Sequence, residues 1–247
     1  MYQLGLVSVS FRPESPEAVI KAAKENGLSC IEWGSDVHAP CQDEARLREI
    51  VNLQEQYGIT CCSYGTYFRL GINPIEELPA HIRAAKILGA DVLRLWAGKQ
   101  SPWDFTETEK EKLFADSKAA AKLAEDAGVK LCLECHMKTY TETAASALEL
   151  LQAVDSPAFQ MYWQPNQRRS VEENAENARE LKDYVNHILV FQWKGKDRFS
   201  LETGIAAWKT YLRQLPGDHA LLLEFMPDDR LESLPAEAAA LRNLTGI

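Results

Sequence analysis

Four polar side chains recur at regular intervals in the second half of the sequence, each at the end of an apolar stretch. The intervals are 30, 28 and 32 residues, and the side chains are those of Glu134, Gln164, Gln192 and Glu224. Each interval is about the length of one strand followed by one helix. Parallel strands end at the same edge of a sheet, so we expect these four oxygen-bearing side chains to meet there.

Two carboxylates that face each other across a small polyol can do proton chemistry on carbon. One removes a proton beside a carbonyl, and the other returns it to the opposite face or to the neighbouring carbon. A divalent ion between them would polarise the carbonyl and stabilise an enediolate, and oxygen ligands suit Mg²⁺ or Mn²⁺. We therefore predict Glu134 and Glu224 as catalytic residues, with Gln164 and Gln192 completing the metal site. The alternative is that such a Glu caps a helix or pairs with Lys or Arg.

The elements that must position these residues follow a repeating pattern. Apolar stretches alternate with helix-forming segments eight times, and a glycine ends several of the helices: Gly27, Gly58, Gly89 and Gly128. Repeated helix–glycine–strand units indicate parallel strands with helical crossovers. Eight units predict a single (β/α)₈ TIM barrel over residues 1–247. An open doubly wound sheet would require an early glycine-rich phosphate loop, which the sequence lacks.

Alternation along each strand predicts which residues accompany the four polar side chains. The residue two positions earlier shares the same face, which selects Cys132, Tyr162, Val190 and Leu222. Active sites of such barrels lie at the carboxyl ends of the strands, so this shared face should line the barrel mouth.

Charge and composition exclude several classes of partner. The net charge of −9 and the pI near 5.2 argue against nucleic acid and against an anionic membrane surface. No run of 18 apolar residues predicts a transmembrane helix. The first four residues, Met1 to Leu4, show no signal-peptide pattern, which predicts a cytoplasmic location. Oligomeric state stays open, with a homo-oligomer among the alternatives.

Six cysteines are present, and a reduced, buried state is predicted for them. Cys132 and Cys135 have the two-residue spacing of a zinc knuckle. Residues three apart on a strand point to opposite faces, however, and the sequence has no second such pair.

The motifs resemble those of the xylose isomerase-like barrel superfamily, in particular its hydroxypyruvate isomerase-like sugar isomerase and epimerase branch. The resemblance spans the whole chain. It rests on Glu134-Cys-His136, on the segment from Gln192 to Asp197-Arg198, and on the strand ends Ile31-Glu32-Trp33 and Arg94-Leu-Trp96. It implies Glu, Asp, His and Glu as metal ligands after strands five to eight, with a Gln in the His position of hydroxypyruvate isomerase-like members. A sugar or keto-sugar is the implied substrate.

The sequence departs from this pattern after the sixth strand. The family has Asp there with a His three residues later, whereas this chain has Gln164 and Gln167. Losing a carboxylate removes one negative charge from the site, so weaker metal binding is expected.

Further residues are predicted to bind the substrate at the mouth. Aromatic faces pack on the C–H faces of sugars, and a guanidinium binds polar or anionic groups. The predicted set is His136, Arg198, Trp33, Trp96, Tyr64 and Gln167.

Two alternatives to a metal-dependent isomerase or epimerase remain. A dehydratase or lyase of the same superfamily begins with the same proton abstraction. A non-catalytic sugar-binding barrel with a degenerate metal site would explain Gln164 and Gln167. DNA repair of the endonuclease IV type needs a histidine-rich zinc cluster and a basic face, and the five scattered histidines and the net charge of −9 argue against it.

Overall fold

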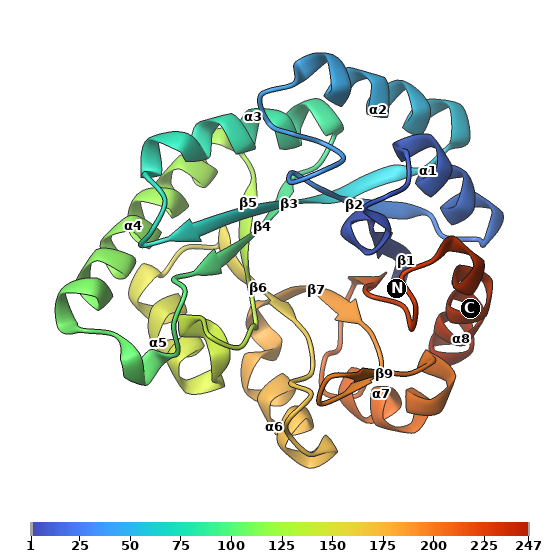
Figure 1. Cartoon of the computed structure of the whole chain (residues 1–247). Helices are drawn as coiled ribbons and strands as arrows, with labels where there is room; N and C mark the ends of the chain where they lie inside the picture. The colour runs from blue at the N-terminus through green and yellow to red at the C-terminus, as the bar shows by residue number, and fades with distance from the viewer. Residues whose placement is uncertain (1, 247) are drawn as a thin grey trace.

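Eight of the apolar segments form parallel strands, and the intervening chain forms helices packed outside them (Figure 1). The structure is a computed structural model that describes residues 2–246. The barrel strands are β1 Tyr2–Val7, β2 Cys30–Gly34, β3 Thr60–Leu70, β4 Val92–Ala97, β5 Lys130–Glu134, β6 Phe159–Trp163, β7 Val185–Val190 and β10 His219–Leu223.

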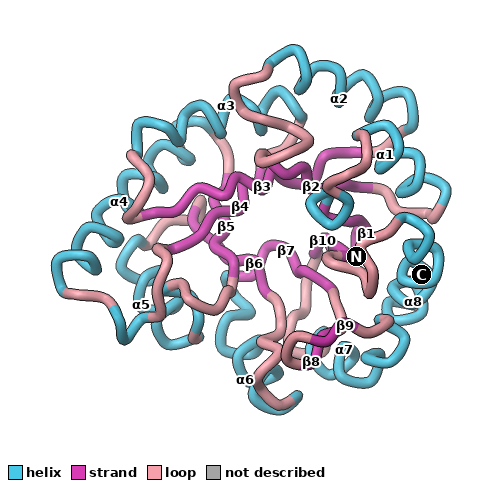
Figure 2. The backbone as a smooth tube through the Cα atoms, in the orientation of Figure 1, coloured by secondary structure: helices cyan, strands magenta, loops and turns pink. Residues whose placement is uncertain are grey.

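The strands close into a ring in the order β1, β10, β7, β6, β5, β4, β3, β2 (Figure 2). The (β/α)₈ barrel predicted from the sequence is therefore confirmed. A short antiparallel hairpin, β8 Trp193–Lys194 and β9 Asp197–Arg198, follows β7. Met1 and Ile247, the ends of the predicted domain, lie outside the described residues.

The helices begin and end where local chemistry favours it. Ser15 accepts a hydrogen bond from the backbone N–H of Ala18 at 3.2 Å, and Gly58, Gly89 and Gly128 end helices with positive φ angles. The helices are α1 Pro16–Glu25, α2 Glu44–Tyr57, α3 Leu78–Leu88, α4 Glu107–Ala127, α5 Ala144–Val154, α6 Val171–Leu181, α7 Ile205–Leu212 and α8 Leu234–Thr245. Within residues 2–246, none of them is long and apolar enough to span a bilayer.

Buried side chains form two layers, one inside the barrel and one between the barrel and the helices. The outer layer is the larger, while the interior is filled mainly by Val7, Cys30, Val92, Cys132, Tyr162, Leu189, Phe191, Ala220 and Leu222. Cys132, Tyr162 and Leu222 therefore face inward as predicted. The site at the mouth lies directly above this interior layer.

Candidate active site

Glu134, the last residue of β5, is held by three hydrogen-bond donors and is only 3% exposed. Arg94 donates to Oε2, the indole N–H of Trp96 donates to the same oxygen at 2.6 Å, and Gln164 Nε2 donates to Oε1 at 3.1 Å. Burial opposes ionisation, but the Arg94 charge and the Trp96 hydrogen bond lower the pKa of Glu134. Glu134 is thus an anchored carboxylate that is ionised at neutral pH.

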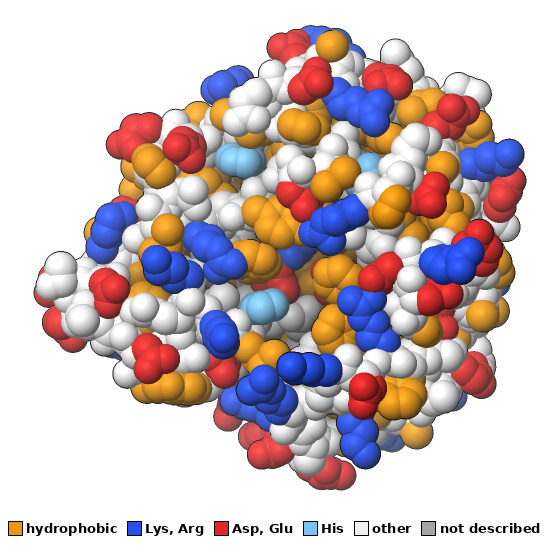
Figure 3. All heavy atoms as spheres, viewed as in Figure 1, with side chains coloured by type: hydrophobic (Ala, Val, Ile, Leu, Met, Phe, Trp, Pro, Cys, Tyr) orange, Lys and Arg blue, Asp and Glu red, His pale blue; other side chains and the backbone are white. Residues whose placement is uncertain are grey.

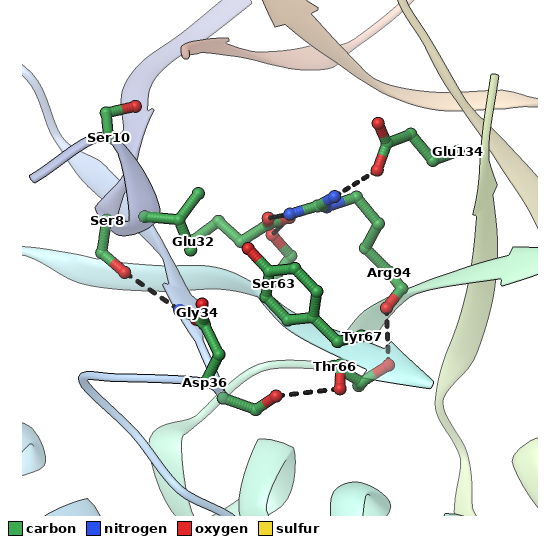
Figure 4. Close-up of polar contacts among 12 residues, drawn as sticks. Ser8, Ser10, Glu32, Gly34, Asp36, Ser63, Thr66, Tyr67, Arg94 and Glu134 are labelled. Atoms are coloured by element: carbon green, nitrogen blue, oxygen red, sulfur yellow. Dashed lines mark hydrogen bonds and ion pairs between the residues drawn. The ribbon is translucent and has the colours of Figure 1, made fainter. Parts of the chain in front are cut away.

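Arg94, in β4, lies between Glu134 and a second carboxylate, Glu32 of β2 (Figure 4). Its Nε and Nη2 atoms both lie 2.8 Å from Glu32 Oε1. Burial lowers the pKa of Arg94, but the charges of Glu32, Glu134 and Glu224 raise it well above its ordinary value. The barrel mouth therefore contains a permanently charged cation, the guanidinium group of Arg94.

Strand β3 is shaped to accommodate the pair formed by Arg94 and Glu32. Ser63 donates to Glu32 Oε2 at 2.8 Å. Gly65 leaves the necessary space, because a Cβ there would lie 2.9 Å from Glu32 Oε1 and 3.0 Å from Arg94 Nη2. Glu32 is completely buried, and these contacts replace the water that its carboxylate loses on burial.

Glu224, immediately after β10, is the second predicted catalytic carboxylate and is 5% exposed. Its backbone N–H donates to Val190 O at 3.0 Å, while no donor within residues 2–246 holds its carboxyl group. Burial, followed by the charges of Glu134 and Glu32, raises the pKa of Glu224 to about 8. The two carboxyl groups thus have opposite pKa shifts in one site.

Gln164 follows β6 and joins the site as a hydrogen-bond donor. Besides Glu134, its Nε2 atom donates to the carbonyl oxygen of Cys135 at 2.8 Å. Its Oε1 atom is buried and has no partner in the described part of the chain. A carboxylate at this position would repel Glu134, whereas the amide stabilises it.

The structure does not bring Gln192 to this site. Leu189 and Phe191 face the barrel interior and Val190 packs outside, the reverse of the predicted phase. The Gln192 side chain lies against Gly204 at the start of α7, where an added Cβ would lie 2.0 Å from its Oε1. Both faces of β7 are apolar, so alternation alone does not reveal which face is inward.

The predicted metal ligands therefore do not fit a resident Mg²⁺ or Mn²⁺ ion. Glu134 is occupied by Arg94 and Trp96, Gln164 presents an N–H to it, and Gln192 lies elsewhere. Within residues 2–246, no three His, Cys, Asp or Glu side chains are placed to hold a metal ion.

Two of the predicted aromatic residues point away from the barrel interior. The Trp33 indole donates to Gln54 of α2 at 2.8 Å, and the Tyr64 hydroxyl donates to Ala39 O at 2.6 Å. Both side chains are completely buried between the barrel and the helices. The prediction that they bind substrate is wrong, because alternation turns Glu32 inward and Trp33 outward on β2, and turns Ser63 inward and Tyr64 outward on β3.

The other predicted binding residues lie at or near the mouth. His136 packs on Trp96 with ring centroids 5.5 Å apart, and Gln167 lines a small polar cavity beside it. Arg198 pairs with Asp229 and lies over the Trp193 ring, 4.8 Å from its centroid. Their binding of a substrate stays a prediction. Figure 3 shows Lys and Arg side chains gathered around the hollow at the centre of this face.

Four mouth residues were not predicted as site residues. Arg94 and Glu32 form the ion pair, Tyr67 accepts a hydrogen bond from Arg12 at 2.6 Å, and Arg69 packs 3.8 Å from the Trp96 centroid. The signal for Arg94 was present in the sequence: it is a charge inside the apolar stretch Val-Leu-Arg-Leu-Trp. For Tyr67 there was none, since it depends on a positive φ of 55° late in β3.

Comparison with known proteins identifies the family. The model of the xylose isomerase-like TIM barrel family matches residues 20–244, and the chain belongs to this family. A 3-dehydroshikimate dehydratase of Bacillus anthracis is 26% identical over 161 residues, which are 62% of this chain and 58% of that enzyme. The match thus spans little more than half of that relative.

Solved structures share the fold over nearly the whole chain. A probable 3-DHS dehydratase of Bacillus anthracis has a TM-score of 0.79 at 20% identity, covering 98% of this chain and 99% of that one. D-psicose 3-epimerase of Clostridium cellulolyticum H10 has a TM-score of 0.72 at 14% identity, with 99% of each chain covered. Proteins described as a dehydratase and as an epimerase therefore share this barrel fold.

Proposed function

We propose that this chain is an isomerase that moves a proton beside the carbonyl group of a small sugar or keto-sugar. The observation that supports this most is the buried carboxyl group of Glu224, which has no hydrogen-bond donor among residues 2–246 and lies near the anchored carboxylate of Glu134. A carboxyl group whose pKa is about 8 can both take and return a proton near neutral pH.

The geometry favours Glu224 as the single acid–base group. Glu134 is held by three donors and its pKa is lowered, so it is a weak base and positions its neighbours instead. One carboxylate can remove a proton from a carbon and return it to the adjacent carbon on the same face, while the hydroxyl proton of the first carbon moves to the former carbonyl oxygen. This supports isomerisation over epimerisation, which places the proton on the opposite face.

Arg94 supports the same chemistry by its charge. Removing a proton beside a carbonyl develops negative charge on oxygen, and a fixed cation in a buried site lowers the energy of that state. The Arg94 guanidinium lies behind Glu134 and is 5% exposed, so it acts through the field in the mouth.

Proton exchange in D₂O tests the proposal. A panel of aldoses, ketoses and hydroxypyruvate is incubated with the protein, and products and deuterium incorporation are followed by NMR. Glu224→Gln should reduce turnover by roughly a thousandfold. Glu202→Gln, at an exposed carboxyl group before α7, is the matched control and should leave turnover unchanged. Full activity of Glu224→Gln would disprove the assignment.

A dehydratase is the second candidate function. The same single carboxyl group could remove a proton and then protonate the departing hydroxyl, and the 26% identity to a 3-dehydroshikimate dehydratase supports including this reaction. Incubation with 3-dehydroshikimate separates the candidates, since an aromatic product appears only if water is lost.

A further inference from the structure

We propose that the guanidinium of Arg94 takes the place of a divalent cation in this barrel mouth, so that the site works without a resident metal. The proposal concerns how the charge of the site is balanced, and it does not depend on which reaction the site catalyses. It is carried by four features of the structure: the contacts of Arg94, the packing that holds it, the orientation of Gln164 and the position of Gln192.

Arg94 makes the contacts to carboxylates that a bound cation would make. One edge of its guanidinium contacts Glu32, with Nε and Nη2 each 2.8 Å from Oε1, and Nη1 donates to Glu134. The planar group thus bridges two carboxylates from β2 and β5, as Figure 4 shows. A guanidinium is suited to this role because its donors form a rigid fork and its charge is never lost.

The surrounding residues hold the guanidinium in this position. Glu32 is completely buried, and its second oxygen accepts a hydrogen bond from Ser63. Its carboxylate therefore pairs with Arg94 and does not contact solvent. Gly65 has no side chain where a Cβ would come within 3.0 Å of Arg94 Nη2. Thr66 fixes the strand by donating to the Arg94 carbonyl oxygen at 2.8 Å.

The same arrangement disfavours a metal ion. A divalent cation bound to Glu134 would lie beside a like charge in a buried site, where repulsion is strong. Gln164 directs an N–H group to Glu134, which satisfies the carboxylate without adding negative charge. Gln192, a ligand that the sequence suggested, packs on Gly204 instead. Removing the Arg94 charge should therefore create affinity for a metal ion.

The first experiment measures metal in the wild-type protein. Protein purified without chelator is analysed for metal content, and Mn²⁺ is titrated into it by calorimetry and in thermal unfolding. We expect substoichiometric metal, no saturable binding at millimolar Mn²⁺ and an unchanged Tm. One tightly bound divalent ion per chain would overturn the proposal.

The second experiment removes the charge while keeping a side chain of similar length. Arg94→Met leaves Glu32, Glu134 and Glu224 without their cation, and we expect Mn²⁺ to bind at least about tenfold more tightly than to the wild type and to raise the Tm. Arg94→Lys retains a cation and should gain no affinity. Arg48→Met, which removes an exposed guanidinium paired with Glu44 on α2, is the matched control and should also gain none.

The outcomes of these variants decide the matter without any assay of activity. If Arg94→Met folds but binds no Mn²⁺, the proposal is overturned, because the charge of Arg94 would then not be the cause of the weak metal binding. If Arg94→Met does not fold, Gln164→Asp takes its place: it adds a carboxylate beside Glu134 while leaving the guanidinium present. We expect Gln164→Asp to stay metal-free, and stoichiometric Mn²⁺ binding by that variant would overturn the proposal.

Discussion

At the scale of single residues, Glu224 should set the pH dependence of turnover. Its pKa of about 8 means that most molecules carry a protonated carboxyl group at neutral pH. If the ionised form is the base, kcat/KM should rise about tenfold per pH unit below pH 8 and become constant above it. A pH profile of the wild type measures this directly. A profile that becomes constant near pH 5 would contradict the assignment.

The buried carboxyl group of Glu224 should also lower the free energy of unfolding. Its folded pKa lies above its unfolded value of 4.5, so the folded state binds the proton more tightly, and stability falls as the pH rises from about 4.5 through 8. Glu224→Gln removes this penalty and should stabilise the protein by roughly 3 kcal/mol more at pH 8 than at pH 5. Urea unfolding at the two pH values measures the difference, and equal effects would argue against a raised pKa.

At the scale of elements, the position of Arg94 depends on β3 as much as on β4. Gly65→Ala would place a methyl group 2.9 Å from Glu32 Oε1, so the ion pair must move. We expect a loss of about 2 kcal/mol in stability and a clear fall in kcat/KM. Gly89→Ala, at a helix end with nothing within 4 Å, is the control: it should reduce stability and leave kcat/KM unchanged.

The order of the elements followed from the sequence because glycines and apolar stretches alternate along the whole chain. The barrel, the inward position of Cys132 and the pairing of Glu134 with Glu224 in one mouth were all accessible in this way. The inward face of β7 was not, since apolar side chains lie on both faces of this strand near its carboxyl end. Alternation alone cannot distinguish the two faces there, and Gln192 was misplaced for that reason.

At the scale of the whole molecule, the barrel interior should be sensitive to lost volume. Leu222 is completely buried there and lies opposite Gly5 of β1, the strand that closes the ring with β10. Leu222→Ala should reduce the free energy of unfolding by about 3 kcal/mol, measured by urea denaturation. Val37→Ala, at a side chain that is 41% exposed, should change it by less than about 0.5 kcal/mol. Similar losses in both variants would show that the interior is not tightly packed.

The cysteines inside the barrel can report on the opening of the closed ring of strands. Cys30 and Cys132 are completely buried. Burial also raises the pKa of the Cys132 thiol, so Cys132 offers neither accessible surface nor thiolate in the folded state. An alkylating reagent can therefore label Cys132 only when strands separate. The labelling rate in native buffer would measure the free energy of barrel opening, with a reporter that the chain already carries.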